Sequence, residues 1–291
     1  MISYEKSVDP LEDLFSRRLI FVMGKGGVGK TTVGISLAGI AAQRNKKVLL
    51  VELGDAETIG RLYSGRALPR TPVPLAYGVQ GARVDARAEL EAYLRAHIPS
   101  KFIAGKISRS RLFDYLFEAA PGLKEIMSLG RLWRWEQQAL HLSDAPFDLI
   151  IVDAPASGHA ASLLRLPDAL IKMIRFGPVV NQLRGLENLL KDHQKTALVL
   201  VTLPEELPVN EMLELYHMAR DSLDMAVAAS IVNSAQPVVF SAREMDQIHS
   251  IKKMHPDPTA GIEKAWVRCV APAVSNWPRN CISQGNRTFL I

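Results

Sequence analysis

The chain alternates between short, mainly apolar runs and longer segments in which apolar positions recur every three or four residues. Short apolar runs are typical of strands buried on both faces of a parallel sheet, and the wider spacing is typical of helices that pack on such a sheet. The runs lie at 19–23, 48–51, 147–152, 197–202 and 225–232, and their polar members are Asp148, Thr202 and Ser230. This pattern predicts an α/β fold with a doubly wound, mainly parallel sheet.

The first apolar run leads directly into a glycine-rich loop and then into a predicted helix. The loop and helix start read Gly-Lys-Gly-Gly-Val-Gly-Lys-Thr-Thr, which satisfies G-x-x-x-x-G-K-[ST] between a strand and a helix. Glycines let backbone N–H groups converge on one anion, and the positive end of the helix dipole points at the same place. We therefore predict a site for a nucleotide di- or triphosphate, formed by Gly24, Lys25, Gly26, Gly27, Val28, Gly29, Lys30, Thr31 and Thr32.

The polar residues of this loop have separable chemical roles. Lys30 is a point charge for the β- and γ-phosphates, and Thr32 is expected to donate to the α-phosphate. The Thr31 hydroxyl is a natural ligand for Mg²⁺. A second Mg²⁺ ligand is expected at Asp153, which ends the aliphatic run at 149–152 as a Walker B carboxylate does.

Lys25 is a second lysine inside the loop, and phosphate binding alone does not require it. At this residue the sequence resembles the signature-lysine branch of P-loop ATPases, which includes the MinD/ParA partition proteins, nitrogenase iron protein, and the ArsA and Get ATPases. The resemblance implies an ATP-gated homodimer in which Lys25 reaches the partner's nucleotide and neutralises developing charge. The alternative is a loop lysine that faces solvent.

The segment after Asp153 narrows this resemblance. Residues 153–159 read Asp-Ala-Pro-Ala-Ser-Gly-His, and residues 163–167 read Leu-Leu-Arg-Leu-Pro. This resembles the second switch of the ArsA/Get family, and partition ATPases lack its Gly-His pair. The resemblance implies that the Gly158 N–H meets the γ-phosphate and that the segment relaxes when that phosphate leaves. His159 then belongs to the switch, with a metal ligand as the alternative.

The first switch departs from the family pattern. The second apolar run is followed by Glu52, Leu53, Gly54 and Asp55, where the family usually has Asp-Pro-Ala-His with a leading aspartate that orients the attacking water. Ungapped alignment places Gly54 at that aspartate, so Asp55 takes the role only after a shift of one residue. We expect Asp55 to orient the water, and Glu52 is the alternative. Glu52 still belongs to the strand end and could instead bind Mg²⁺ through water or a lysine of the partner.

Asn233 directly follows the last apolar run. Its side-chain amide can read the edge of adenine, as the resemblance implies, and this favours ATP over GTP. The alternative is an asparagine that only caps the turn at the strand end.

The same patterns predict the domain organisation. Residues 1–255 are expected to form the P-loop ATPase domain, with a helical insertion at 83–142 and an irregular tail at 256–291. In ArsA and Get relatives the insertion handles the client, although apolar stripes at helical spacing are also typical of a plain core. Residues 1–17 are predicted to be a loose lead-in, and residues 56–82, rich in proline and glycine, a mobile segment.

Composition adds constraints on location and partners. The 291-residue chain carries a formal net charge of +5, but its basic and acidic residues are interspersed, so we expect no nucleic-acid partner. Cys269 and Cys281 form no C-x-x-C pair, which indicates a reducing compartment and leaves their roles open. No apolar stretch approaches the ~20 residues of a membrane span, and the acidic N-terminus does not resemble a signal peptide. We expect a cytoplasmic protein.

These observations predict an ATPase that hydrolyses ATP with Mg²⁺ and works as a homodimer closed across the nucleotide face. The residues expected to carry catalysis are Lys25, Lys30, Asp55 and Asp153. A client protein or anion would bind the insertion, and a membrane partner is left open. Two alternatives remain: a MinD/ParA-like partition or positioning ATPase that acts on DNA or membrane, and a nucleotide-binding adaptor with little turnover.

Overall fold

The computed structural model describes residues 10–54, 57–98, 100–108, 110–120, 122–141, 146–173, 178–235 and 287–290. Its centre is an eight-stranded sheet with the order β3-β4-β2-β5-β1-β6-β7-β8. All neighbouring strands are parallel except the β3/β4 pair. The strands are β1 Leu19–Gly24, β2 Val48–Leu53, β3 Val73–Pro74, β4 Gln80–Val84, β5 Leu149–Asp153, β6 Thr196–Thr202, β7 Ala226–Val232 and β8 Arg287–Leu290. The predicted fold class is confirmed.

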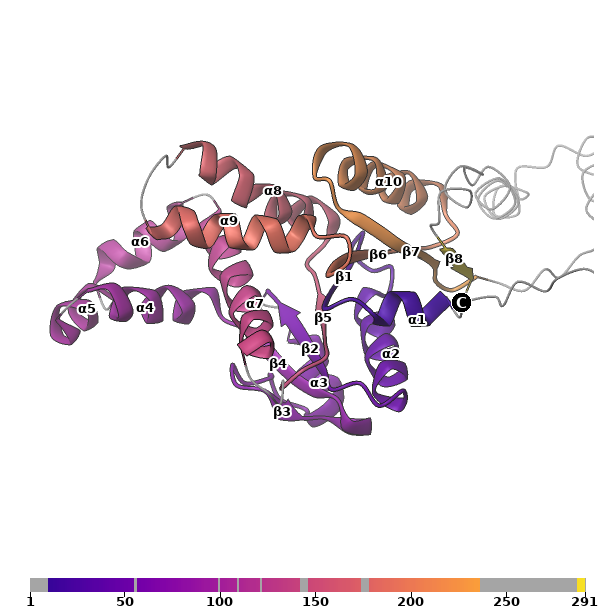
Figure 1. The fold of residues 1–291 in the computed structure, drawn as a ribbon, viewed down its shortest axis with the longest axis horizontal. Helices are drawn as coiled ribbons and strands as arrows, with labels where there is room; N and C mark the ends of the chain where they lie inside the picture. The colour runs from indigo at the N-terminus through magenta and orange to yellow at the C-terminus, as the bar shows by residue number, and fades with distance from the viewer. Residues whose placement is uncertain are drawn as a thin grey trace, which may run out of the picture.

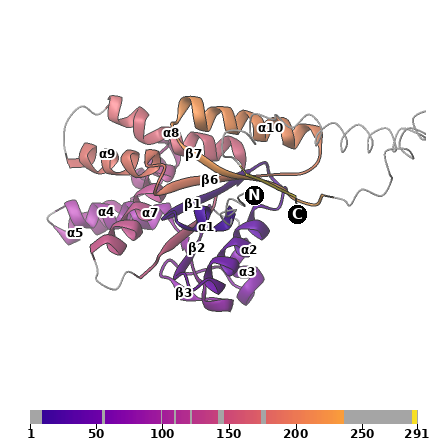
Figure 2. The ribbon, with the colours of Figure 1, turned by 45° about the vertical axis from the view of Figure 1, so that its right-hand side comes forward.

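Helices cover both faces of this sheet, as Figures 1 and 2 show. The helices are α1 Pro10–Phe15, α2 Lys30–Gln43, α3 Thr58–Ser64, α4 Ala86–His97, α5 Lys101–Ser108, α6 Arg111–Ala119, α7 Leu123–His141, α8 Ser157–Met173, α9 Pro178–Lys191 and α10 Glu206–His217. Two short helical turns, η1 Ala76–Gly78 and η2 Met218–Ser222, connect neighbouring elements.

The two faces of the sheet have separate hydrophobic cores. On one face, apolar side chains of α1, α2 and α3 pack on the strands. On the other face, the strands pack against α7, α8, α9 and α10. Alternate residues of β1 show this division, because Phe21 belongs to the second core and Val22 to the first. A strand buried on both faces is mainly apolar, which explains the apolar runs in the sequence.

β1 lies between β5 and β6 near the middle of the sheet, and every residue of it is buried. The carboxyl ends of parallel strands lie at one edge, so the loop after β1 opens beside the ends of β5 and β6. β5 also pairs with β2 in a register that sets Glu52 opposite Asp153. The sheet thereby brings two carboxylates from distant parts of the sequence to the edge that carries the glycine-rich loop.

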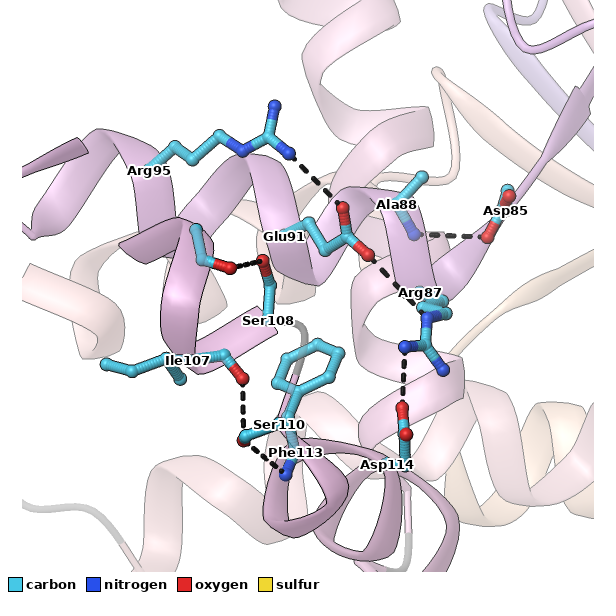
Figure 3. A network of polar contacts seen from close by, with 11 residues as sticks. Asp85, Arg87, Ala88, Glu91, Arg95, Ile107, Ser108, Ser110, Phe113 and Asp114 are labelled. Atoms are coloured by element: carbon cyan, nitrogen blue, oxygen red, sulfur yellow. Dashed lines mark hydrogen bonds and ion pairs between the residues drawn. The ribbon is translucent and has the colours of Figure 1, made fainter. Parts of the chain in front are cut away.

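Helices α4, α5 and α6 extend beyond the sheet on the side away from α2 (Figure 1). α4 packs on α7, and α7 packs on α8 and α9. Figure 3 shows how charged side chains connect α4 and α6: Arg87 lies 3.6 Å from Glu91 and 2.5 Å from Asp114. Residues 85–141 therefore include a helical layer built on α7, within the predicted insertion.

Two segments differ from the sequence-based expectations. Residues 10–15 form α1, in which Leu14 and Phe15 are buried against the sheet, so the loose lead-in was wrong for this part. Residues 58–64 form α3, and residues 80–82 belong to β4, where a mobile segment was expected. β4 pairs with β2, and this pairing satisfies the backbone hydrogen bonds of β4. Its glycine-containing sequence alone does not indicate a strand.

Of the predicted irregular tail, the structure describes residues 287–290, and these form β8 beside β7. Cys269 and Cys281 lie outside the described residues. Within the described parts of the chain, no helix combines the length and the apolar character needed to cross a membrane.

Candidate nucleotide-binding site

The glycine-rich loop joins β1 to α2 and has a backbone that only glycine can provide at its two ends. A Cβ atom on Gly24 would lie 2.2 Å from the carbonyl oxygen of Val201 in neighbouring β6. Gly29, the residue before α2, has a φ of 90° and would place a Cβ atom 2.2 Å from Nδ2 of Asn233. The loop is therefore held closely against β6 and the end of β7.

Lys30 is the first residue of α2, and its ammonium group points back over the loop. Nζ donates a hydrogen bond of 3.0 Å to the carbonyl oxygen of Lys25. Burial lowers the pKa of Lys30, and the nearby Asp153 carboxylate partly opposes this shift. An anion bound in the loop would therefore compensate the Lys30 ammonium group for the hydration that it loses by burial. This matches the predicted role of Lys30 toward phosphate.

Thr31 and Asp153 meet at the start of α2. The Thr31 hydroxyl donates a hydrogen bond of 2.6 Å to Oδ2 of Asp153. The other carboxylate oxygen, Oδ1, is buried without a hydrogen-bond partner in the described structure. Burial raises the pKa of Asp153 and Glu52 adds to this effect, whereas the hydrogen bond from Thr31 and the charge of Lys30 lower it. Asp153 is thus a desolvated carboxylate with one oxygen still available.

Glu52 completes an acidic pair with Asp153. The residue is only 1% exposed, and Oε1 accepts a hydrogen bond of 3.0 Å from the backbone N–H of Ile59. Its other oxygen, Oε2, is buried and has no hydrogen-bond partner among the described residues. Two adjacent buried carboxylates with one orphaned oxygen each are unfavourable alone and favourable beside a cation. The hard oxygen donors of Thr31, Asp153 and Glu52 therefore fit Mg²⁺.

Lys25, the proposed signature lysine, points away from the loop centre. Its Nζ lies 3.2 Å from Oε1 of Glu211 on α10, and both side chains are 30% exposed. The two lysines of the loop therefore have different surroundings, since Lys30 turns back onto the loop and Lys25 turns toward α10. Glu211 could not be predicted as a partner of Lys25, because its only local signal is an acidic residue on the helix after β6.

Asn233 follows β7 and contacts the phosphate loop. Its Nδ2 donates 2.9 Å to the carbonyl oxygen of Val28, and its Oδ1 accepts 2.9 Å from the N–H of Ser234. Both arms of the amide therefore fix the loop and the following turn. Recognition of adenine by Asn233 stays a prediction.

The remaining predicted site residues lie around this centre. Gly26, Gly27 and Thr32 are exposed, as a loop open to a ligand requires, whereas Val28 is buried under it. Gly158 belongs to the first turn of α8, and the side chain of His159 lies outside what the structure describes. Asp55 also lies outside the described residues, so its role as the water-orienting carboxylate stays a prediction.

A parallel sheet with a glycine-rich loop between its central strand and a helix, a loop lysine and an adjacent threonine–aspartate pair define a P-loop nucleoside triphosphatase. The family model of the anion-transporting ATPases, ArsA_ATPase, matches residues 17–180. The chain belongs to this family, and it is an ATPase.

Curated relatives agree with this assignment. The chain is 32% identical over 234 residues to ATPase BagA of Mycobacterium tuberculosis, covering 78% of this chain and 68% of that protein. It is 28% identical over 258 residues to the ATPase ASNA1 homolog of Entamoeba dispar, covering 75% and 76% of the two chains. ATPase get3 of Schizosaccharomyces japonicus is 28% identical over 200 residues, covering 64% and 58%.

Proposed function

We propose that this protein is a cytoplasmic, ATP-driven homodimeric switch that couples Mg²⁺-dependent ATP hydrolysis to the state of its helical insertion. The observation that carries the proposal is that the side chains of the two loop lysines point in different directions. Lys30 folds back onto its own loop, whereas Lys25 extends to Glu211 at the surface beside it. A lysine that serves only its own nucleotide has no reason to lie against α10.

The residues of one chain divide the binding of ATP between them. The loop from Gly24 to Gly29 and the start of α2 surround the triphosphate, and Lys30 neutralises the β- and γ-phosphates. Thr31, Asp153 and Glu52 would hold Mg²⁺, which when bound supplies charge neutralisation to the β- and γ-phosphate oxygens. Release of the Thr31–Asp153 hydrogen bond would free both side chains for this purpose.

Hydrolysis requires a carboxylate that orients water and a positive charge that stabilises the transition state. Asp55 is proposed for the first task. Lys25 of the opposing subunit would supply the second, after it leaves Glu211 on its own chain. The segment at 153–159, with the Gly158 N–H at the γ-phosphate, would then transmit loss of phosphate to α8, which packs on α7 of the insertion.

Paired substitutions separate nucleotide binding from hydrolysis. Lys30→Ala should remove detectable ATP binding, because no other loop side chain neutralises the β- and γ-phosphates. Lys25→Ala should bind Mg²⁺·ATP within about twofold of the parent protein yet lose hydrolysis by about a thousandfold, the lower end for charge donated in trans. Calorimetric ATP titration and phosphate release measure the two effects. Undiminished hydrolysis by Lys25→Ala would refute the role of Lys25.

A further inference from the structure

A cavity of about 830 Å³ lies in the helical layer, away from the glycine-rich loop. Its walls come from α4, α7, α8 and α9, together with the segment before β3. This volume lies within the range of about 300–1,000 Å³ that is usual for pockets that bind small molecules. The residues of the nucleotide site do not take part in it.

One part of the cavity wall is apolar. Large side chains there come from Tyr93 on α4, Ile126, Met127 and Trp133 on α7, and Leu186 on α9. Small residues also line it, among them Gly130 on α7 and Ala88, Ala92 and Ala96 on α4. A wall of this kind favours an alkyl or aryl group, because burial of apolar surface is its main source of affinity.

The lining of the cavity also carries an excess of positive charge. Arg70, Arg131 and Arg134 line it together with a single carboxylate, Glu89. Glu89 is 9% exposed and forms ion pairs with Arg131, at 3.5 Å, and with Arg134. Among the described residues, no carboxylate pairs with Arg70. One acid therefore pairs with two of the three cations, and the formal charge of these four side chains is positive.

The guanidinium of Arg131 is held in place and still lacks a complete set of acceptors. It lies 4.4 Å from the centre of the Trp135 ring. Its buried Nε lies 3.5 Å from Oε1 of Glu89 and forms no hydrogen bond in the described structure. Burial lowers the pKa of Arg131, and the charges of Arg134 and Arg70 lower it further, although Glu89 opposes them. An additional anion at this place would relieve the repulsion between the arginines.

We propose that this cavity binds a single-chain anionic amphiphile, with its alkyl chain against α7 and α9 and its carboxylate or phosphate head at Arg70, Arg131 and Arg134. The size of the cavity argues against a membrane-spanning helix. Such a helix, about 30 Å long and about 10 Å wide, occupies roughly 2,400 Å³, far more than one chain offers here. The three arginines favour a ligand with an anionic head over an uncharged one, because Glu89 is the single carboxylate that lines the cavity with them.

The proposal is independent of the dimeric switch, so it is tested on the full chain without nucleotide. The probes are dodecanoate and dodecyl phosphate below their micellar concentrations, with dodecanol and dodecyltrimethylammonium as uncharged and cationic counterparts. Calorimetric titration should show saturable binding of one or both anions and at least tenfold weaker binding of the other two. The carboxylate and phosphate probes distinguish the two possible head groups.

Substitutions locate the binding site. Arg70→Gln should weaken binding of the anions about tenfold, the loss of one charge-assisted contact, without affecting folding, because Arg70 supports no other described side chain. Met127→Trp, which fills the apolar part, should weaken binding of both anions whatever their head group. The control is Arg95→Gln on the other face of α4, where Arg95 lies 3.4 Å from Glu91 (Figure 3). It should change the dissociation constant by less than twofold.

Circular dichroism and thermal unfolding would establish that each variant is folded. The proposal is overturned if neither anion binds the parent protein, or if dodecanol binds as tightly as dodecanoate. It is also overturned if Arg70→Gln and Arg95→Gln bind the anions equally well. Binding of a 20-residue polyleucine–alanine helix in preference to both anions would assign the cavity to a protein segment instead. None of these outcomes depends on ATP hydrolysis or on dimer formation.

Discussion

Lys25 and Glu211 form an ion pair of 3.2 Å within one chain, between the glycine-rich loop and α10. Both side chains are partly exposed, so the pair contributes at most about 1 kcal/mol. An interaction of this size can hold Lys25 in place without preventing its release. If Lys25 acts on the nucleotide of a second subunit, Glu211 competes with that nucleotide for the same ammonium group.

The first prediction follows from this competition. Glu211→Gln should lower the protein concentration needed for half-maximal ATP hydrolysis by up to about fivefold, the equivalent of about 1 kcal/mol. Phosphate release measured over a range of protein concentrations tests this. Glu214→Gln is the matched control, because Glu214 is an exposed acid on the same helix and Lys25 is paired with Glu211. An equal shift in both variants would show a general charge effect and would contradict the competition.

The second prediction concerns the buried acidic pair. Asp153→Asn should stabilise the metal-free protein at pH 7 by on the order of 1 kcal/mol, the usual size of a single-residue effect. Its physical reason is that burial and Glu52 disfavour the charged form of Asp153, which an asparagine does not have. The same substitution should abolish hydrolysis, because it removes a proposed Mg²⁺ ligand. Urea unfolding in EDTA measures the change in stability.

The pH dependence of this difference has a definite sign. The pKa of Asp153 is raised in the folded protein, so the wild-type carboxyl group is destabilising only when it is charged. The stability that Asp153→Asn gains over the parent protein should therefore be at its full value when the pH lies above the raised pKa. This gain should shrink as the pH falls from the raised pKa toward the ordinary value of 3.8. An advantage that grows on acidification would contradict this account of the site.

The third prediction separates backbone strain from steric contact in the loop. Gly27 and Gly29 have φ values of 85° and 90°, but only Gly29 has a neighbour, Asn233, where a Cβ atom would lie. Gly27→Ala should therefore cost about 1–2 kcal/mol of stability from strain alone, and Gly29→Ala should cost more. Urea unfolding compares the two variants.

The double variant Gly29→Ala/Asn233→Ala provides the control for this comparison. Removing the Asn233 side chain removes the clash but leaves the backbone strain. In the Asn233→Ala background, Gly29→Ala should therefore cost about as much stability as Gly27→Ala costs in the parent protein. If the double variant is instead less stable than Gly29→Ala alone by the full cost of Asn233→Ala, the contact between the two residues carries no coupling energy.

Local sequence was sufficient for the centre of the molecule. The run Leu19–Gly24 and the loop after it follow a pattern that depends on neighbouring residues alone, so both could be predicted. α1 and β4 could not be predicted in this way. α1 is short and is stabilised by burial of Leu14 and Phe15 against distant strands, and β4 depends on its pairing with β2.

The candidate site shows the same division. The roles proposed for Lys30, Thr31 and Asp153 came from a motif, and the structure brings these three side chains together. From the sequence, Glu52 was only the alternative to Asp55 as the water-orienting carboxylate. Its place beside Asp153 depends on the β2/β5 register, which the sequence does not show. Glu211 was missed because its contact with Lys25 depends on where α10 packs. Such relationships are set by strand order and helix docking rather than by spacing along the chain.

The central claim is that Lys25 acts on the nucleotide of the opposing subunit, and mixing two inactive variants tests it most directly. Lys25→Ala keeps its own Asp153, and Asp153→Asn keeps its own Lys25, so a mixed dimer contains one complete composite site. Phosphate release from the equimolar mixture should reach about a quarter of the parent rate, because about half of the dimers are mixed and each has one working site of two. A mixture no more active than either variant alone would contradict the account.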